Sequence, residues 1–178
     1  MFPDLSDSRQ AWLALTLLDG VGPRFIQRLL QEFTSPSAFL NAEPATLRAL
    51  GVVPRVLNSL AALQRGESSL LARLQLALEW QTSAGQQIIC LDETDYPALL
   101  RQIADPPAVL FVRGNAGLLG DPQIAMVGTR HPSPLGAETA RAFARSFTQA
   151  GLSVTSGMAL GVDAVPYTLL TLPTTHAF

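Results

Sequence analysis

The second half of the chain contains a strand, a helix and another strand in that order, which limits the folds open to it. Its apolar strand candidates are 87–91, 108–112, 123–127 and 152–155. Between the last two, Ser133 and Pro134 favour the start of a helix that runs to residue 150. We predict that the inward face of this helix carries Ala140, Phe143, Ala144 and Phe147. Two strands joined through a helix lie parallel, so we predict an α/β fold with buried parallel strands.

The first 85 residues carry helix signals and no strand pattern. Asp7 to Gln10 suits a capping box before an apolar run that ends at Asp19 and Gly20. Pro23 favours the first turn of a second helix, which we predict to bury one face with Phe25, Ile26, Leu29 and Leu30. Further helices are predicted from Ser35-Pro36, from Glu43-Pro44, over 54–65 and over 67–84. We therefore predict a helical domain at 1–85 and a second domain from residue 86.

Composition restricts the class of protein only loosely. The chain has 178 residues, 48% of them hydrophobic, and a net charge of −2, so it is not a strongly basic protein that coats nucleic acid. All twelve basic residues are arginine, which codon usage in a GC-rich genome would explain. No apolar run approaches the roughly 20 residues of a membrane span. With no evident signal peptide, we expect a cytoplasmic protein.

The turn after the third strand candidate is the more specific of two predicted anion sites. Gly128, Thr129 and Arg130 join a strand to a helix, where open N–H groups and the helix dipole favour an anion. The pattern is not the G-x-G-x-x-G fingerprint, which disfavours a dinucleotide cofactor. An ordinary turn with a solvated arginine is the alternative.

A second loop follows the next strand and should lie beside the first. It begins with Ser156, Gly157 and Met158, and it again supplies glycine and hydroxyl groups. Ligands bind at the carboxyl ends of parallel strands in such folds, so we predict that both loops contact a phosphate chain.

The helical half offers a weaker candidate. Gly20, Gly22 and Arg24 lie between two short helices, as in a helix-hairpin-helix element whose glycines let backbone N–H groups approach a DNA phosphate. A tight turn that only packs two helices is the alternative.

Catalytic patterns are poor. His131 has no evident nucleophile beside it, and the acidic residues Asp92, Glu93 and Asp95 are typical of a solvated turn. Cys90 lies in an apolar strand and is predicted to be a core residue. Trp12 and Trp80 are predicted to pack on helical faces. We predict no catalytic residue, no metal site and no cofactor, and therefore a protein that is not an enzyme.

Several stretches of the chain resemble the DprA/Smf family of DNA-processing proteins. They are 95–100, 105–114, 124–130, 134–136 and 151–163, in the order found in that family. The helical half resembles the family's N-terminal helix-hairpin-helix or sterile-alpha-motif-like domain. The resemblance extends from residue 8 to about residue 164. It implies that 86–178 is a partial, Rossmann-like α/β domain.

The resemblance also implies a function and partners. Members of the family bind incoming single-stranded DNA in natural transformation, protect it, help to load the RecA recombinase and act as dimers. The family's Gly-Ser/Thr-Arg turn corresponds to Gly128, Thr129 and Arg130, and its Ser-Gly loop to Ser156 and Gly157.

The tail departs from the family. After Asp163 an Asp-x-x-Ala-His pattern is expected, but the chain continues with Ala164 and reaches Pro166, which opposes a helix. His176 lies in this abnormal tail. We hypothesise a C-terminal truncation, which predicts uncovered apolar faces, weak DNA binding and impaired function. Two alternatives remain open: a nucleotide-processing hydrolase on a related lysine-decarboxylase-like Rossmann fold, and a non-functional fragment.

Overall fold

The computed structural model describes residues 6–66, 68–157, 159–164 and 176–177. The chain divides into two compact units, Met1–Phe111 and Val112–Ala177. The change from helices to strands does occur near residue 85, where α6 ends at Trp80 and β1 begins at Gln86. The two compact units, however, divide after Phe111 rather than after residue 85. The reason is that the first strands share the core of the helices.

The first unit begins with six helices. They are α1 (Ser8–Leu17), α2 (Pro23–Glu32), α3 (Pro36–Leu40), α4 (Pro44–Ala49), α5 (Pro54–Gln64) and α6 (Ser68–Trp80). The Asp7 side chain caps α1 by accepting the N–H of Gln10 at 2.9 Å. Each of α2 to α5 starts with proline in its first turn, where a missing N–H costs nothing. The predicted helix starts are confirmed.

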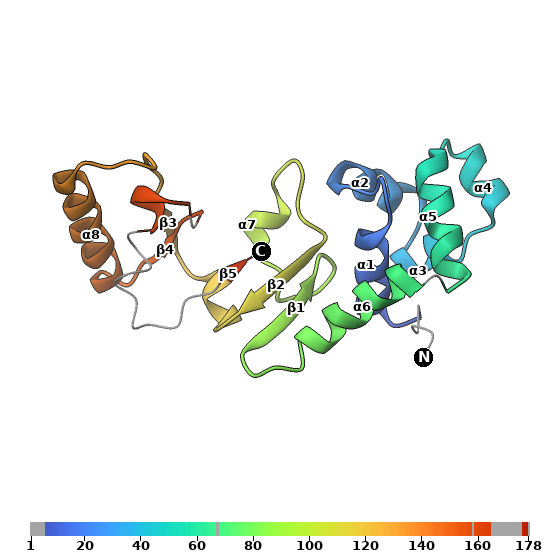
Figure 1. The fold of residues 1–178 in the computed structure, drawn as a ribbon, viewed down its shortest axis with the longest axis horizontal. Helices are drawn as coiled ribbons and strands as arrows, with labels where there is room; N and C mark the ends of the chain where they lie inside the picture. The colour runs from blue at the N-terminus through green and yellow to red at the C-terminus, as the bar shows by residue number, and fades with distance from the viewer. Residues whose placement is uncertain (1–5, 67, 158, 165–175, 178) are drawn as a thin grey trace. The chain divides into compact units, whose positions relative to one another are not determined.

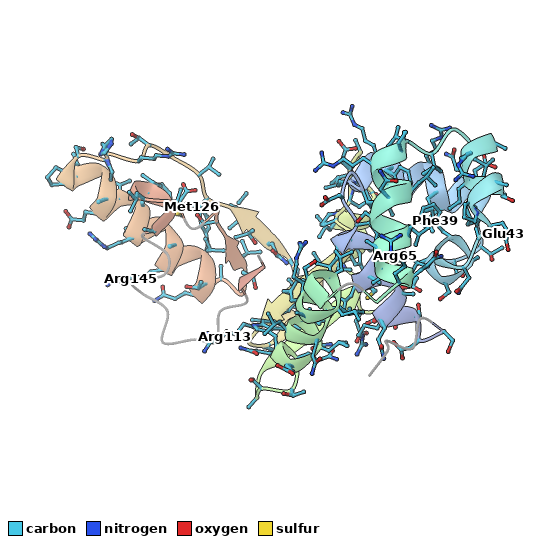
Figure 2. The ribbon with its side chains drawn as sticks, turned by 45° about the vertical axis from the view of Figure 1, so that its right-hand side comes forward. Phe39, Glu43, Arg65, Arg113, Met126 and Arg145 are labelled. Atoms are coloured by element: carbon cyan, nitrogen blue, oxygen red, sulfur yellow. The ribbon has the colours of Figure 1, made fainter. Side chains whose placement is uncertain are left out.

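The helical core forms around α1, which packs against α3 and α6 (Figure 1). Trp12 and Phe39 are its largest fully buried side chains, and Figure 2 labels Phe39 inside the helical unit. Ile26 and Leu29 are buried as predicted, but Leu30 is 38% exposed. That part of the prediction was wrong, because a turn of 100° per residue puts Leu30 at the edge of the buried stripe.

Two strands complete the first core. β1 (Gln86–Cys90) neighbours β2 (Val109–Arg113), and the end of β2 pairs antiparallel with β5 (His176–Ala177). Ile88, Cys90 and Ala108 belong to the same buried cluster as the helices. Cys90 is therefore a core residue, as predicted. Between the strands, the short helix α7 (Ala98–Arg101) was not predicted by the turn-rich sequence around it.

The acidic turn after β1 is largely solvated, as predicted, because Asp92 and Asp95 are exposed, but Glu93 is half-buried and has a partner. Arg9 forms an ion pair with Glu93 at 2.9 Å, and Ser8 donates to Asp92 at 2.9 Å. Partial burial works against the charged Arg9 side chain, but the hydrogen bond and attraction to Glu93 outweigh it and raise its pKa. The turn thus anchors the start of α1.

The second unit contains the predicted strand, helix and strand. They are β3 (Gln123–Ala125), α8 (Pro134–Gln149) and β4 (Ser153–Thr155), with short 3-10 helices η1 (Ala116–Gly120) and η2 (Gly161–Ala164). β3 and β4 pair in parallel, with Ile124 opposite Val154, which confirms the predicted β-α-β unit (Figure 1).

Burial in the second unit is lower than predicted. β3 and β4 form a separate two-stranded sheet in which the side chains of Gln123 and Ala125 are exposed, so β3 is not a buried strand. Ala140 and Ala144 face inward on α8, but Phe143 is 54% exposed. Phe143 lies 100° around α8 from the buried Ala144, at the edge of the face that Ala140 and Ala144 share. Val127 and Leu135 are also exposed apolar residues of this unit.

Candidate nucleic-acid interface

The two predicted anion-binding loops begin side by side. Beyond the paired strands, the N–H of Met126 donates to the carbonyl of Thr155 at 2.8 Å. This hydrogen bond extends the parallel pairing of β3 and β4 to the carboxyl ends of both strands. The chain then enters the turn at Gly128 on one side and the loop at Ser156 on the other. The predicted adjacency of these loops is confirmed.

The second loop closes directly on the backbone of the first. Gly161 has a φ of +88°, and a Cβ there would meet the Thr129 carbonyl oxygen and lie 2.6 Å from the Arg130 Cα. Val162 donates its N–H to the Thr129 carbonyl at 3.1 Å. Only glycine permits this approach at position 161, because both the conformation and the space exclude a side chain.

Gly128 also permits close approach, as predicted, but its N–H is not open. A Cβ at Gly128 would lie 2.7 Å from the Cβ of Val162. The Gly128 N–H donates to the Asp163 Oδ1 at 3.1 Å. The contribution of Gly128 to an anion site is therefore the space that it leaves, rather than a hydrogen bond.

Asp163 is the residue that sequence reasoning missed. The residue is 9% exposed, and its backbone carbonyl accepts the Ser156 hydroxyl at 3.1 Å. A Cβ at Gly157 would lie 3.2 Å from Asp163 Oδ2. The available signal was the position of this acid, which directly follows two residues that close a glycine-rich loop. A carboxylate in a loop that is predicted to bind an anion indicates a role within the protein for that side chain.

The groups that remain open point away from the second loop. The Thr129 carbonyl faces Val162, and the N–H of Arg130 belongs to the same planar trans peptide, so it points in the opposite direction. Within the described part of the chain, the N–H groups of Thr129 and Arg130 find no acceptor, and the exposed Arg130 side chain forms no ion pair. Met158, the last predicted site residue, lies outside the described residues.

The start of α8 adds a favourable field to these donors. The Ser133 hydroxyl caps the helix by accepting the N–H of Gly136 at 3.1 Å, and Pro134 lies in the first turn, both as predicted. The 16-residue helix has no acidic side chain in its first turn. Its positive end is thus left uncompensated beside the Arg130 turn.

The helical hairpin contains the predicted glycines and a second arginine, Arg55, beside them. Gly20 has a φ of +87°, and Gly22 has open space where a side chain would lie. The exposed Arg24 side chain, however, pairs with Asp105 at 3.3 Å. Arg55 comes close to Gly20, with its Cδ 3.4 Å from the position of a Cβ there, and it forms no ion pair with a described residue. Arg55 is therefore a second arginine close to this turn.

The described residues contain no group of three or more side chains that could hold a metal ion. Burial above all raises the pKa of the Cys90 thiol to about 12, so this thiol is a poor nucleophile. His131 is exposed, and its backbone N–H donates to the Thr129 hydroxyl at 3.2 Å. No described helix is long and apolar enough to cross a membrane.

Comparisons with known proteins show which family the sequence resembles. The family model of DNA recombination-mediator protein A matches residues 87–170. Protein Smf of Synechocystis is 33% identical over 167 residues, which are 90% of this chain and 40% of that protein. DNA processing protein DprA of Bacillus subtilis is 30% identical over 145 residues, which are 78% of this chain and 49% of that protein. The chain thus spans less than half the length of these two relatives.

A solved structure supports the fold. The X-ray structure of DNA processing protein A from Streptococcus pneumoniae aligns over 90% of this chain and 50% of that chain, with a TM-score of 0.58 at 20% identity. At this identity the likeness concerns the fold. Together with the matched sequence stretches, it leads to one conclusion: the chain belongs to the DprA/Smf family of DNA-processing proteins.

Proposed function

We propose that the chain binds single-stranded DNA, without turnover, through the turn at Gly128 and the loop at Ser156. The observation that carries this proposal is the orientation of the Thr129–Arg130 peptide. Its carbonyl accepts the Val162 N–H, so its own N–H points the opposite way, and the side chain of the same residue, Arg130, is exposed. A backbone N–H and a neighbouring guanidinium can donate hydrogen bonds to two oxygens of the same phosphate group.

Each site residue has a distinct part in the proposal. Arg130 supplies charge and a planar fork, while Thr129 supplies a second open N–H. Gly128 and Gly157 leave room for close packing of the loops, and Ser156 fixes the second loop through its bond to the Asp163 carbonyl. The nearby helix end adds a sequence-independent attraction for phosphate.

The family resemblance extends the proposal to the biological role. Protection of incoming DNA in transformation, loading of RecA and dimer formation are properties of whole family proteins. We propose them for the protein to which this sequence corresponds, with residues 86–178 belonging to its Rossmann-like domain. The helical hairpin with Gly20, Gly22 and Arg24 is a secondary contact in this proposal.

Oligonucleotide binding measured against salt concentration tests the proposal. Arg130→Ala should weaken binding to a labelled single strand about tenfold and reduce the slope of log affinity against log salt by about 0.7, the value for one lost phosphate contact. Arg145→Ala is the matched control, because Arg145 is an exposed arginine of the same unit on α8. It should lower affinity much less.

Two results would overturn this function. Equal losses for Arg130→Ala and Arg145→Ala would mean that only net charge matters, not the turn. Saturable turnover of a nucleotide by the chain would instead favour a hydrolase on a related fold.

A further inference from the structure

The carboxylate of Asp163 lies inside the site proposed to bind an anion. Asp163 is the buried charged residue of the described chain, and it forms no ion pair with a described cation. Burying a charge without a partner is costly unless hydrogen bonds compensate it. One backbone N–H, from Gly128 at 3.1 Å, is the compensation that its carboxylate receives among the described groups. This placement therefore needs an explanation beyond packing.

The contacts of Asp163 reach the ends of both strands. Its carboxylate holds Gly128, which follows β3, and its carbonyl accepts the hydroxyl of Ser156, which follows β4. The preceding residue, Val162, holds the Thr129 carbonyl. One short segment thus fixes three consecutive features of the site: the Gly128 N–H, the Thr129 carbonyl and the start of the second loop.

We propose that Asp163 is a positioning residue for the DNA contact, an inference that rests on the proposed function. By accepting the Gly128 N–H, its carboxylate keeps phosphate away from that group and holds the turn against the second loop. The Thr129–Arg130 peptide then keeps the orientation in which its N–H faces outward. The phosphate is directed to Thr129 and Arg130, about one residue further along the turn.

Two substitutions separate the hydrogen bond from the charge. Asp163→Asn keeps an oxygen that accepts the Gly128 N–H and removes the negative charge near the phosphate. It should bind single-stranded DNA up to about threefold more tightly, as expected for one charge at a water-like dielectric. Asp163→Ala removes the acceptor and leaves the Gly128 N–H unpaired, so it should bind about tenfold more weakly.

Amide hydrogen exchange on the full chain provides a readout that does not depend on DNA. The Val162 N–H should exchange about tenfold faster in Asp163→Ala than in the wild type, and at the wild-type rate in Asp163→Asn. Equal DNA affinity of the alanine and asparagine variants, or unchanged Val162 exchange in the alanine variant, would overturn the inference. If Asp163→Ala does not fold, Asp163→Asn decides alone: weaker binding than the wild type by more than twofold contradicts it.

The result separates this inference from the proposed function. Equal affinities of the wild type and Arg130→Ala would reject the DNA site at Arg130. The exchange rates of Val162 would still show whether Asp163 holds the two loops together.

Discussion

The close contact at Gly161 makes a quantitative prediction, because the chain offers a matched control for it. Gly161 and Gly151 have nearly the same backbone conformation, with φ of +88° and +82°. A Cβ at Gly161 would lie 2.6 Å from the Arg130 Cα, whereas a Cβ at Gly151 would meet nothing within 4 Å. Alanine at both positions therefore creates the same backbone strain but only one steric conflict.

The expected magnitudes follow from these two terms. An alanine in the left-handed conformation costs about 1–2 kcal/mol, which applies to both variants. Forcing a methyl group into an occupied space costs about 1–3 kcal/mol more, which applies only to Gly161→Ala. The neighbouring atoms are backbone, so they cannot yield as a side chain would. We expect the second loop to separate from the turn at Arg130.

Hydrogen exchange of the Val162 N–H measures this separation, since that group bonds to the Thr129 carbonyl across the two loops. Exchange should be about 5- to 150-fold faster in Gly161→Ala than in Gly151→Ala, which corresponds to the additional 1–3 kcal/mol. Affinity for single-stranded DNA should fall in the same variant. Equal exchange rates in the two variants would refute the argument that the loops are held by direct backbone contact.

Two further outcomes are expected. Arg55→Ala should weaken oligonucleotide binding about threefold and Arg24→Ala less, because Asp105 already pairs with Arg24; titration of both variants checks this, and the opposite order would contradict it. The raised pKa of Cys90 predicts that its contribution to stability is complete below pH 9 and is lost as pH rises toward about 12. Urea unfolding of the wild type and Cys90→Ala between these pH values measures the loss, and parallel curves would exclude it.

Local signals predicted most of the secondary structure and the adjacency of the two candidate loops. Asp7 as a cap and proline in the first turn of four helices of the first unit mark helix starts through contacts within a few residues. The adjacency of the loops at Gly128 and Ser156 followed from parallel pairing alone. Such features depend on residues that are close in sequence or on the order of the strands and helices, so they can be predicted from a single sequence.

Contacts between distant residues could not be predicted in the same way. Glu93 pairs with Arg9 across 84 positions, a contact that the acidic turn did not indicate. Asp163 takes the Gly128 N–H across 35 positions, which changes the donors that are open to an anion. The division of the units after Phe111 likewise depends on which core the strands join. Tertiary packing decides each of these.

The prolines at the starts of α2, α3, α4, α5 and α8 have a consequence for how the protein tolerates change in length. Proline has no N–H and is not tolerated in the interior of a helix, so these helices cannot be extended at their N-terminal ends past the proline. A residue inserted within one of them must be absorbed at its C-terminal end, and every side chain after the insertion rotates by 100°. Natural length variation should therefore collect in the links between helices.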